Sequence, residues 1–216
     1  MQLKFITMAL LFTVSAYAES SAWYDKVKMS GDFRYRFEQK ELPDTKTNNL
    51  ERIRARIKTV AQIDENVVAT IGLSTEPGNI TSRNQTLTDG GTGKSMAFDM
   101  AYFDYSPFAN TNILAGKMGL PFYTPGKESV AFDSDWTPEG LAIQYSMDQG
   151  SWGAFANFAS LWFVDQTNVS DVKLYAPQVG FELKNDSMHA YLGYGYYNFS
   201  SIQGEKRQHY VGIGLC

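Results

Sequence analysis

Two neighbouring stretches of this chain alternate charged and apolar side chains with a strict period of two, over residues 32–38 and 52–58. A β-strand sends successive side chains to opposite faces, so each stretch predicts a strand with one apolar and one densely charged face. A water-soluble sheet turns the apolar face inward, whereas a transmembrane barrel turns it toward lipid and keeps the charged face in a wet lumen. The charged positions are Asp32, Arg34, Arg36, Glu38, Arg52, Arg54, Arg56 and Lys58.

The N-terminus has the three parts of a secretory signal peptide. Lys4 is the positive residue, residues 5–14 form a mostly apolar stretch, and 16–18 read Ala-Tyr-Ala before the expected cleavage site. The apolar stretch is much shorter than the ~20 residues of a spanning helix. We therefore expect residues 1–18 to be removed, and residues 19–216 to form one domain of an exported protein. The net charge of −4 gives no support to nucleic-acid binding, which usually needs a basic patch.

The rest of the chain divides into about ten predicted strands, most of them longer than the ~5–6 residues typical of soluble sheets. Short turns at 64–66, 148–150 and 184–186 alternate with long polar connections, among them 77–95 and 120–138. Outer-membrane barrels have this asymmetry, with short periplasmic turns and longer outer loops. The predicted strands cover residues 27–39, 50–63, 66–76, 96–106, 111–119, 139–147, 151–163, 171–184, 187–198 and 207–215.

Several motifs carry a family resemblance. The most specific are Gly116-Lys117-Met118 followed by Pro121-Phe122, and Asp133-x-Asp135-x-x-Pro138-Glu139-Gly140. With these motifs, residues 28–147 resemble the "putative porin" family of Gram-negative outer-membrane barrels. The resemblance implies an all-β antiparallel transmembrane β-barrel for passive diffusion of small hydrophilic solutes and ions. It also implies contact with outer-membrane lipid, frequent homotrimers, and neither enzymatic activity nor a cofactor. Since about ten strands are few for a wide porin, we expect the N-terminal portion of a larger barrel of ~16 strands.

The charged row at 52–58 is the first candidate site. If it pairs with 32–38 as a hairpin, both rows share one face and form a mixed-charge wall, which channels use to select solutes. The alternative is a solvated ladder of ion pairs that supports the wall without touching a solute. On neighbouring predicted strands, Asp99 and Lys117 are expected to pair across the lumen face. Asp104 has the opposite parity to Asp99, which predicts either a bulge near Phe103 or a place for Asp104 at the polar rim.

The long connection at 120–138 is the second candidate site. Its charged residues Lys127, Glu128, Asp133 and Asp135 make it a candidate loop for narrowing the lumen, although an external surface loop is slightly favoured. Asp133 and Asp135 are too few for a Ca²⁺ ion, which takes 6–8 oxygen ligands, so no metal site is expected.

Two other functional classes stay open at this point. A secreted β-sandwich could bind carbohydrate through surface aromatics and Asp pairs, and it would be soluble without detergent. An outer-membrane enzyme would need a Ser/His or carboxylate cluster, and none is evident in the sequence. The two histidines, His189 and His209, are 20 residues apart and have no further partner at ligand spacing.

Overall fold

The computed structural model describes residues 23–40, 48–78, 82–87, 90–124, 131–164, 172–185, 188–200 and 209–215. Within these ranges the regular structure is a short 3₁₀ helix, η1 (Trp23–Lys26), followed by β-strands. The predicted signal peptide lies outside the described residues. The strands are β1 (Val27–Lys40), β2 (Asn48–Asp64), β3 (Val67–Thr75), β4 (Gln85–Thr86), β5 (Met96–Phe108), β6 (Thr111–Lys117), β7 (Glu139–Asp148), β8 (Trp152–Val164), β9 (Val172–Lys184), β10 (His189–Tyr196), β11 (Asn198–Phe199) and β12 (His209–Leu215).

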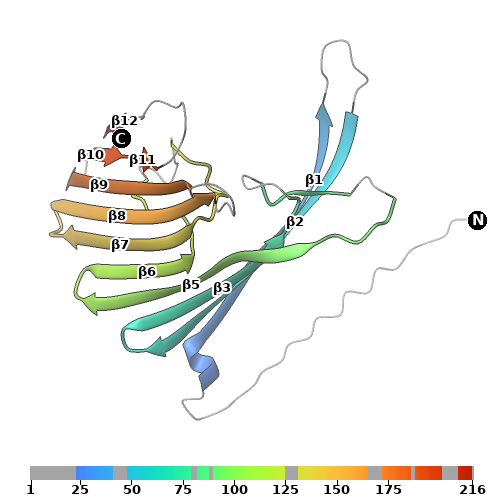
Figure 1. Cartoon of the computed structure of the whole chain (residues 1–216), viewed down its shortest axis with the longest axis horizontal. Helices are drawn as coiled ribbons and strands as arrows, with labels where there is room; N and C mark the ends of the chain where they lie inside the picture. Colours follow the sequence, from blue (N-terminus) through green and yellow to red (C-terminus); the bar gives the residue numbers. More distant parts are fainter. Residues whose placement is uncertain are drawn as a thin grey trace, which may run out of the picture.

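The described strands form a single antiparallel sheet and not the two sheets of a sandwich (Figure 1). Its order is β1-β2-β3-β5-β6-β7-β8-β9-β10-β12, with β4 paired to β2 and β11 paired to β9. Neighbours along the chain are therefore neighbours in the sheet, as in an up-and-down meander. Among the described residues no pair joins β1 to β12, so the sheet is open along this path. No helix in the described part of the chain is long and apolar enough to cross a membrane.

The ten strands predicted from the sequence are confirmed, and their observed ends differ from the predicted ones by at most two residues. The sequence missed only the two-residue strands β4 and β11. Alternation predicts long strands well because each residue adds to the pattern, whereas a two-residue strand has no pattern of its own.

Large apolar side chains are exposed along one face of the sheet. Phe33 on β1 is 70% exposed, Phe103 on β5 is 58% exposed and Leu192 on β10 is 57% exposed. The strand register connects these positions from one strand to the next, so they form a continuous surface, here called the apolar face. It comprises Phe33, Tyr35, Ile57, Ile71, Leu73, Phe98, Phe103, Tyr105, Leu141, Ile143, Tyr145, Phe158, Val179, Phe181, Leu192 and Tyr194. A water-soluble monomer rarely exposes so large an apolar patch.

The opposite face, here called the polar face, holds the buried core of the described residues. The connection after β6 folds back onto this face, and Met118 and Leu174 become fully buried. Phe122 packs edge-on against Tyr197 with the ring centres 5.6 Å apart. Burial raises the pKa of the Tyr197 phenol, which follows β10. The core thus lies between the sheet and its own returning loop rather than between two sheets.

A β-bulge in β5 decides which side chains share the polar face. Gly72 pairs with Met100 and Leu73 pairs with Phe98, so Asp99 is the extra residue of β5. The bulge lets Asp99 and Asp104 point to the same face despite their opposite parity. The predicted bulge is therefore present, but at Asp99 rather than near Phe103.

Two glycines face each other where β6 and β7 meet, since Gly116 pairs with Gly140. Their φ angles are +125° and +150°, a region that residues with a Cβ rarely adopt. A Cβ on Gly140 would lie 2.2 Å from the Ser160 carbonyl oxygen, and one on Gly116 would lie 2.3 Å from that of Ala101. These positions require glycine because the neighbouring backbones approach too closely for a side chain.

We expect Gly140→Ala to destabilise the sheet by about 2 kcal/mol, through the strained φ angle and the clash with β8. The measurement is the thermal midpoint of the β-sheet circular dichroism signal in detergent. Gly93→Ala is the matched control, because a Cβ there would meet nothing within 4 Å. Equal midpoints for the two variants would contradict the close approach of β7 and β8 at Gly140.

Candidate functional site

The β1–β2 hairpin places like charges opposite each other on the polar face. Arg34 pairs with Arg54, and Arg36 pairs with Arg52, in directly opposed positions. Lys58 lies opposite Ser30 and continues the row. Directly opposed like charges are destabilising, so this arrangement needs water or carboxylates beside it.

Two carboxylates on β1, Asp32 and Glu38, each form ion pairs with two arginines of the hairpin. Asp32 contacts Arg54 at 3.0 Å and Arg56 at 2.6 Å, each through a different carboxylate oxygen. Glu38 lies 3.0 Å from Arg36 and 3.4 Å from Arg52. The rows 32–38 and 52–58 thus carry six cations and two carboxylates on the polar face, which leaves them positive. The sequence prediction that the 32–38 and 52–58 rows share one face is confirmed by this register.

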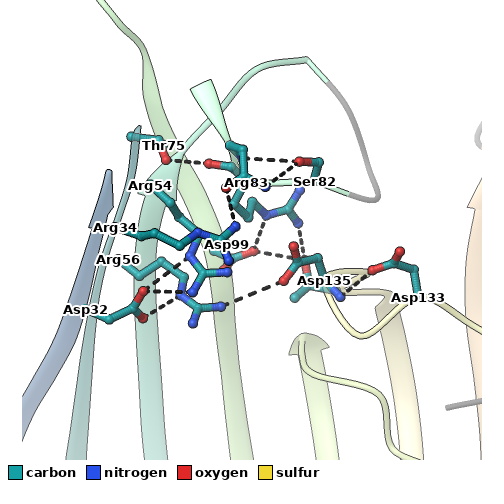
Figure 2. A network of polar contacts seen from close by, with 12 residues as sticks. Asp32, Arg34, Arg54, Arg56, Thr75, Ser82, Arg83, Asp99, Asp133 and Asp135 are labelled. Atoms are coloured by element: carbon teal, nitrogen blue, oxygen red, sulfur yellow. Dashed lines mark hydrogen bonds and ion pairs between the residues drawn. The ribbon is translucent and has the colours of Figure 1, made fainter. Parts of the chain in front are cut away.

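A buried arginine that was not predicted from the sequence, Arg83, links the connection after β3 to β5 and to the β6–β7 connection. Arg83 lies between β3 and β5, is 5% exposed, and donates from Nε to Asp99 Oδ1 at 2.8 Å. Its NH2 group donates to the Thr137 hydroxyl at 3.0 Å, and its carbonyl accepts from the Thr75 hydroxyl at 2.6 Å. Figure 2 shows the Arg83–Asp99 pair together with the charged side chains of the hairpin. Asn84, the next residue, accepts a hydrogen bond from Arg34. No periodic pattern surrounds Arg83, so the sequence held no signal for it.

The β6–β7 connection reaches the same wall. Asp135 lies 3.8 Å from the Arg56 guanidinium, although three strands separate β2 from β7 in the sheet (Figure 2). Asp133 shapes the turn, because its carboxylate accepts from the backbone N–H of Asp135 at 2.8 Å. The sequence analysis slightly favoured an external loop here, but the described residues of this connection contact the polar face. Lys127 and Glu128 lie outside the described residues.

Amide side chains on the polar face hold the first part of this connection. Asn112, Gln144, Asn157 and Gln178 stand opposite one another in successive strands from β6 to β9. Gln178 accepts from the Tyr123 N–H at 2.8 Å and donates to the Tyr123 carbonyl at 2.9 Å. Gln144 donates to the Pro121 carbonyl at 2.9 Å. This amide ladder was not predicted from the sequence. Alternation shows which face each residue occupies, but only the register between strands shows that the four residues lie opposite one another.

Asp99 and Lys117 do not form the pair that the sequence predicted, and this is a correction. Lys117 stands opposite Ala101, on the same face as Phe103, and contacts Glu139 at 3.1 Å. Asp99 lies on the other face with Arg83. Alternation along the strand predicts neither the position of the bulge at Asp99 nor the buried arginine that pairs with it.

The described residues of the polar face offer charge and hydrogen bonds. Within the described residues no three His, Cys, Asp or Glu side chains come together as metal ligands would. The arrangement can attract, orient and screen ions along a wet surface.

Comparison with known families decides the class of the protein. A family model with the description "Putative porin" matches residues 44–214. The chain belongs to this porin family. The match begins later than the resemblance noted in the sequence and extends through the C-terminal strands. No significant match is found among curated proteins. Membership in a porin family implies contact with membrane and solutes. Members of such a family are typically not enzymes.

The Arg83–Asp99 pair generates a stability prediction. We expect Asp99→Asn to destabilise the fold by about 3 kcal/mol, because a buried guanidinium loses its nearest carboxylate. Chemical denaturation followed by tryptophan fluorescence measures this. Asp104→Asn is the matched control on the same strand, since Asp104 bonds only the neutral amide of Asn112 among the contacts described, at 2.8 Å. Equal loss in both variants would contradict the special role of the buried pair.

Proposed function

We propose that the chain is an outer-membrane β-barrel porin through which small hydrophilic solutes and ions diffuse passively. The apolar face contacts lipid, and the polar face lines a water-filled lumen. The observation that carries this proposal is the distribution of side chains across one sheet. Large apolar residues are exposed on one face of nearly every long strand, while the charged hairpin and the amide ladder occupy the other. A soluble carbohydrate-binding sandwich would bury the apolar face instead.

Closure of the barrel follows from the same proposal. In lipid every backbone N–H and C=O must be paired, so neither β1 nor β12 can remain an open edge. We propose that these strands belong to a closed barrel of about sixteen strands, and that barrels assemble as trimers. Export through a cleaved signal peptide at residues 1–18 is part of this proposal.

The β6–β7 connection has the features of a constriction loop. Its described residues are held from one side by the amide ladder and from the other by Arg56 and Arg83. A loop fixed across the lumen reduces the free cross-section and brings Asp135 toward the arginine wall. We propose that Asp133 and Asp135, with Lys127 and Glu128, belong to this constriction.

The wall proposed to face the permeating ions comprises the hairpin charges and Asp99, whereas Lys117 is assigned to the lipid side. The six cations of the rows 32–38 and 52–58 favour anions locally, while Asp32, Glu38 and Asp135 reduce this preference. The net charge of −4 for the whole chain limits any global preference for anions.

The first test is single-channel conductance of the refolded mature chain, beginning at Glu19, in a planar bilayer. Stepwise currents that scale with salt concentration are expected of a water-filled pore. Inserted protein that carries no current would mean that this chain alone does not close the proposed barrel of about sixteen strands. Silence of a chain extended past Cys216 as well would contradict the proposed porin.

Replacing Arg54 and Arg56 with Ala tests whether the wall faces the ions. One charge about 10 Å from an ion in water changes its energy by about 0.4 kcal/mol, with opposite sign for an anion and a cation. Removing two charges should therefore lower the permeability of the anion about fourfold and raise that of the cation about fourfold, so the anion-to-cation ratio falls about 16-fold. Reversal potentials in a dilute salt gradient measure this ratio, because screening is weakest at low ionic strength. Asp32→Asn should shift the ratio the opposite way. An unchanged ratio in both variants would place the wall outside the ion path.

Releasing the loop should enlarge the pore. Gln178→Leu keeps the side-chain size but removes both hydrogen bonds to Tyr123, which weakens loop docking by about 2 kcal/mol. We expect higher conductance and more open-channel noise in bilayer recordings. Gln62→Leu is the control, because Gln62 bonds only the exposed β2–β3 turn among the contacts described. A loss restricted to stability, with unchanged conductance, would contradict the constriction.

A further inference from the structure

A groove of about 500 Å³ opens on the apolar side of the sheet, where β6 to β9 meet the long connections. Its floor is the opposed pair Gly116 and Gly140, which cannot carry side chains without meeting neighbouring backbone. Leu141 and Ser160 continue the floor toward the centre of the apolar face.

A row of charged and amphipathic side chains crosses the strands at this groove. Lys117, Glu139, Trp162 and Lys173 stand opposite one another from β6 to β9. The Lys117 ammonium lies 3.0 Å from the Thr137 carbonyl and 3.1 Å from the Glu139 carboxylate. The Lys173 ammonium lies 3.9 Å from the centre of the Trp162 ring. Two cations and one carboxylate give the row a net positive charge.

The place of this row relative to the apolar face is informative. The next outward-facing row on β6 to β9 is Ala115, Leu141, Ser160 and Tyr175, and the following one contains Ile113, Ile143 and Phe158. Charge thus gives way to apolar side chains within two rows. Tryptophan and lysine at such a boundary are typical of the membrane–water interface, where the ring lies at headgroup depth.

We propose that this groove binds the anionic phosphate headgroup of a membrane lipid, with an acyl chain extending over Leu141 and Ile143. Lys117 and Lys173, which both line the groove, supply the positive charge for the headgroup. Basic pockets at the membrane surface bind lipid headgroups in this way. The inference rests on the proposed function, because it requires the apolar face to lie in lipid. A lipid rather than free phosphate is the occupant, since the groove continues onto the apolar face.

The test uses the mature chain inserted into vesicles of equimolar phosphatidylglycerol and phosphatidylcholine. Native mass spectrometry after mild detergent extraction counts the lipids that remain bound. We expect phosphatidylglycerol to be enriched, and Lys117→Gln/Lys173→Gln to reduce that enrichment about 25-fold, since each lysine near the surface contributes about a factor of five. Glu139→Gln should raise it, because a carboxylate no longer repels the phosphate.

The matched control is Lys28→Gln/Lys184→Gln, which removes the same charge near the short-turn end of the sheet. Equal enrichment in the two double variants, or no effect of Glu139→Gln, would overturn the site. Displacement of phosphatidylglycerol by millimolar inorganic phosphate would also overturn it, because the occupant would then be free phosphate. Failure of the chain to float with the vesicles would instead overturn the proposed membrane function. Conducting protein without lipid enrichment would overturn the lipid site alone.

Discussion

Opposed arginines on the β1–β2 hairpin are the constraint on which the rest of the polar face depends. Arg34 faces Arg54 and Arg36 faces Arg52, so the hairpin cannot pack this face against an apolar layer. Asp32 and Glu38 reduce the repulsion, and the remaining charge requires water. On the hairpin itself the large apolar side chains, Phe33, Tyr35 and Ile57, lie on the other face and are exposed. The charged row and the apolar row of the hairpin are therefore two consequences of one alternation.

The connections that return over the polar face are stabilised by arginine side chains of the β1–β2 hairpin and by amide side chains of β7 and β9. Asp135 approaches Arg56, and Asn84 accepts from Arg34, so both connections bring acceptors to a surface rich in donors. At the far side of the sheet the amide ladder provides donors and acceptors to backbone groups of the loop. Charge complementarity therefore places one part of the β6–β7 connection, and neutral hydrogen bonds place the other.

Local alternation made the strands and the shared face of the hairpin predictable, because the order of polar and apolar residues within one strand shows which residues share a face. The contacts of the loops were not predictable, because they depend on register across several strands. Asp99 shows the difference, since one bulge residue reverses its expected relation to Asp104. Lys117 shows it again: its parity looked compatible with the lumen until the register placed it opposite Ala101. The amide ladder needed four aligned strands before it became visible.

Thr137 links the two faces at the end of the β6–β7 connection. From the polar side its hydroxyl accepts from Arg83 at 3.0 Å and lies 3.3 Å from Asp99. From the apolar side its carbonyl accepts from the Lys117 ammonium at 3.0 Å. The backbone N–H of Met118 donates to the Pro138 carbonyl at 2.9 Å, so the first and last residues of the β6–β7 connection are held together. Lys117 and Glu139 therefore contact the same short segment, residues 137–138, that follows Asp135. The proposed headgroup groove and the proposed constriction loop meet at these few residues.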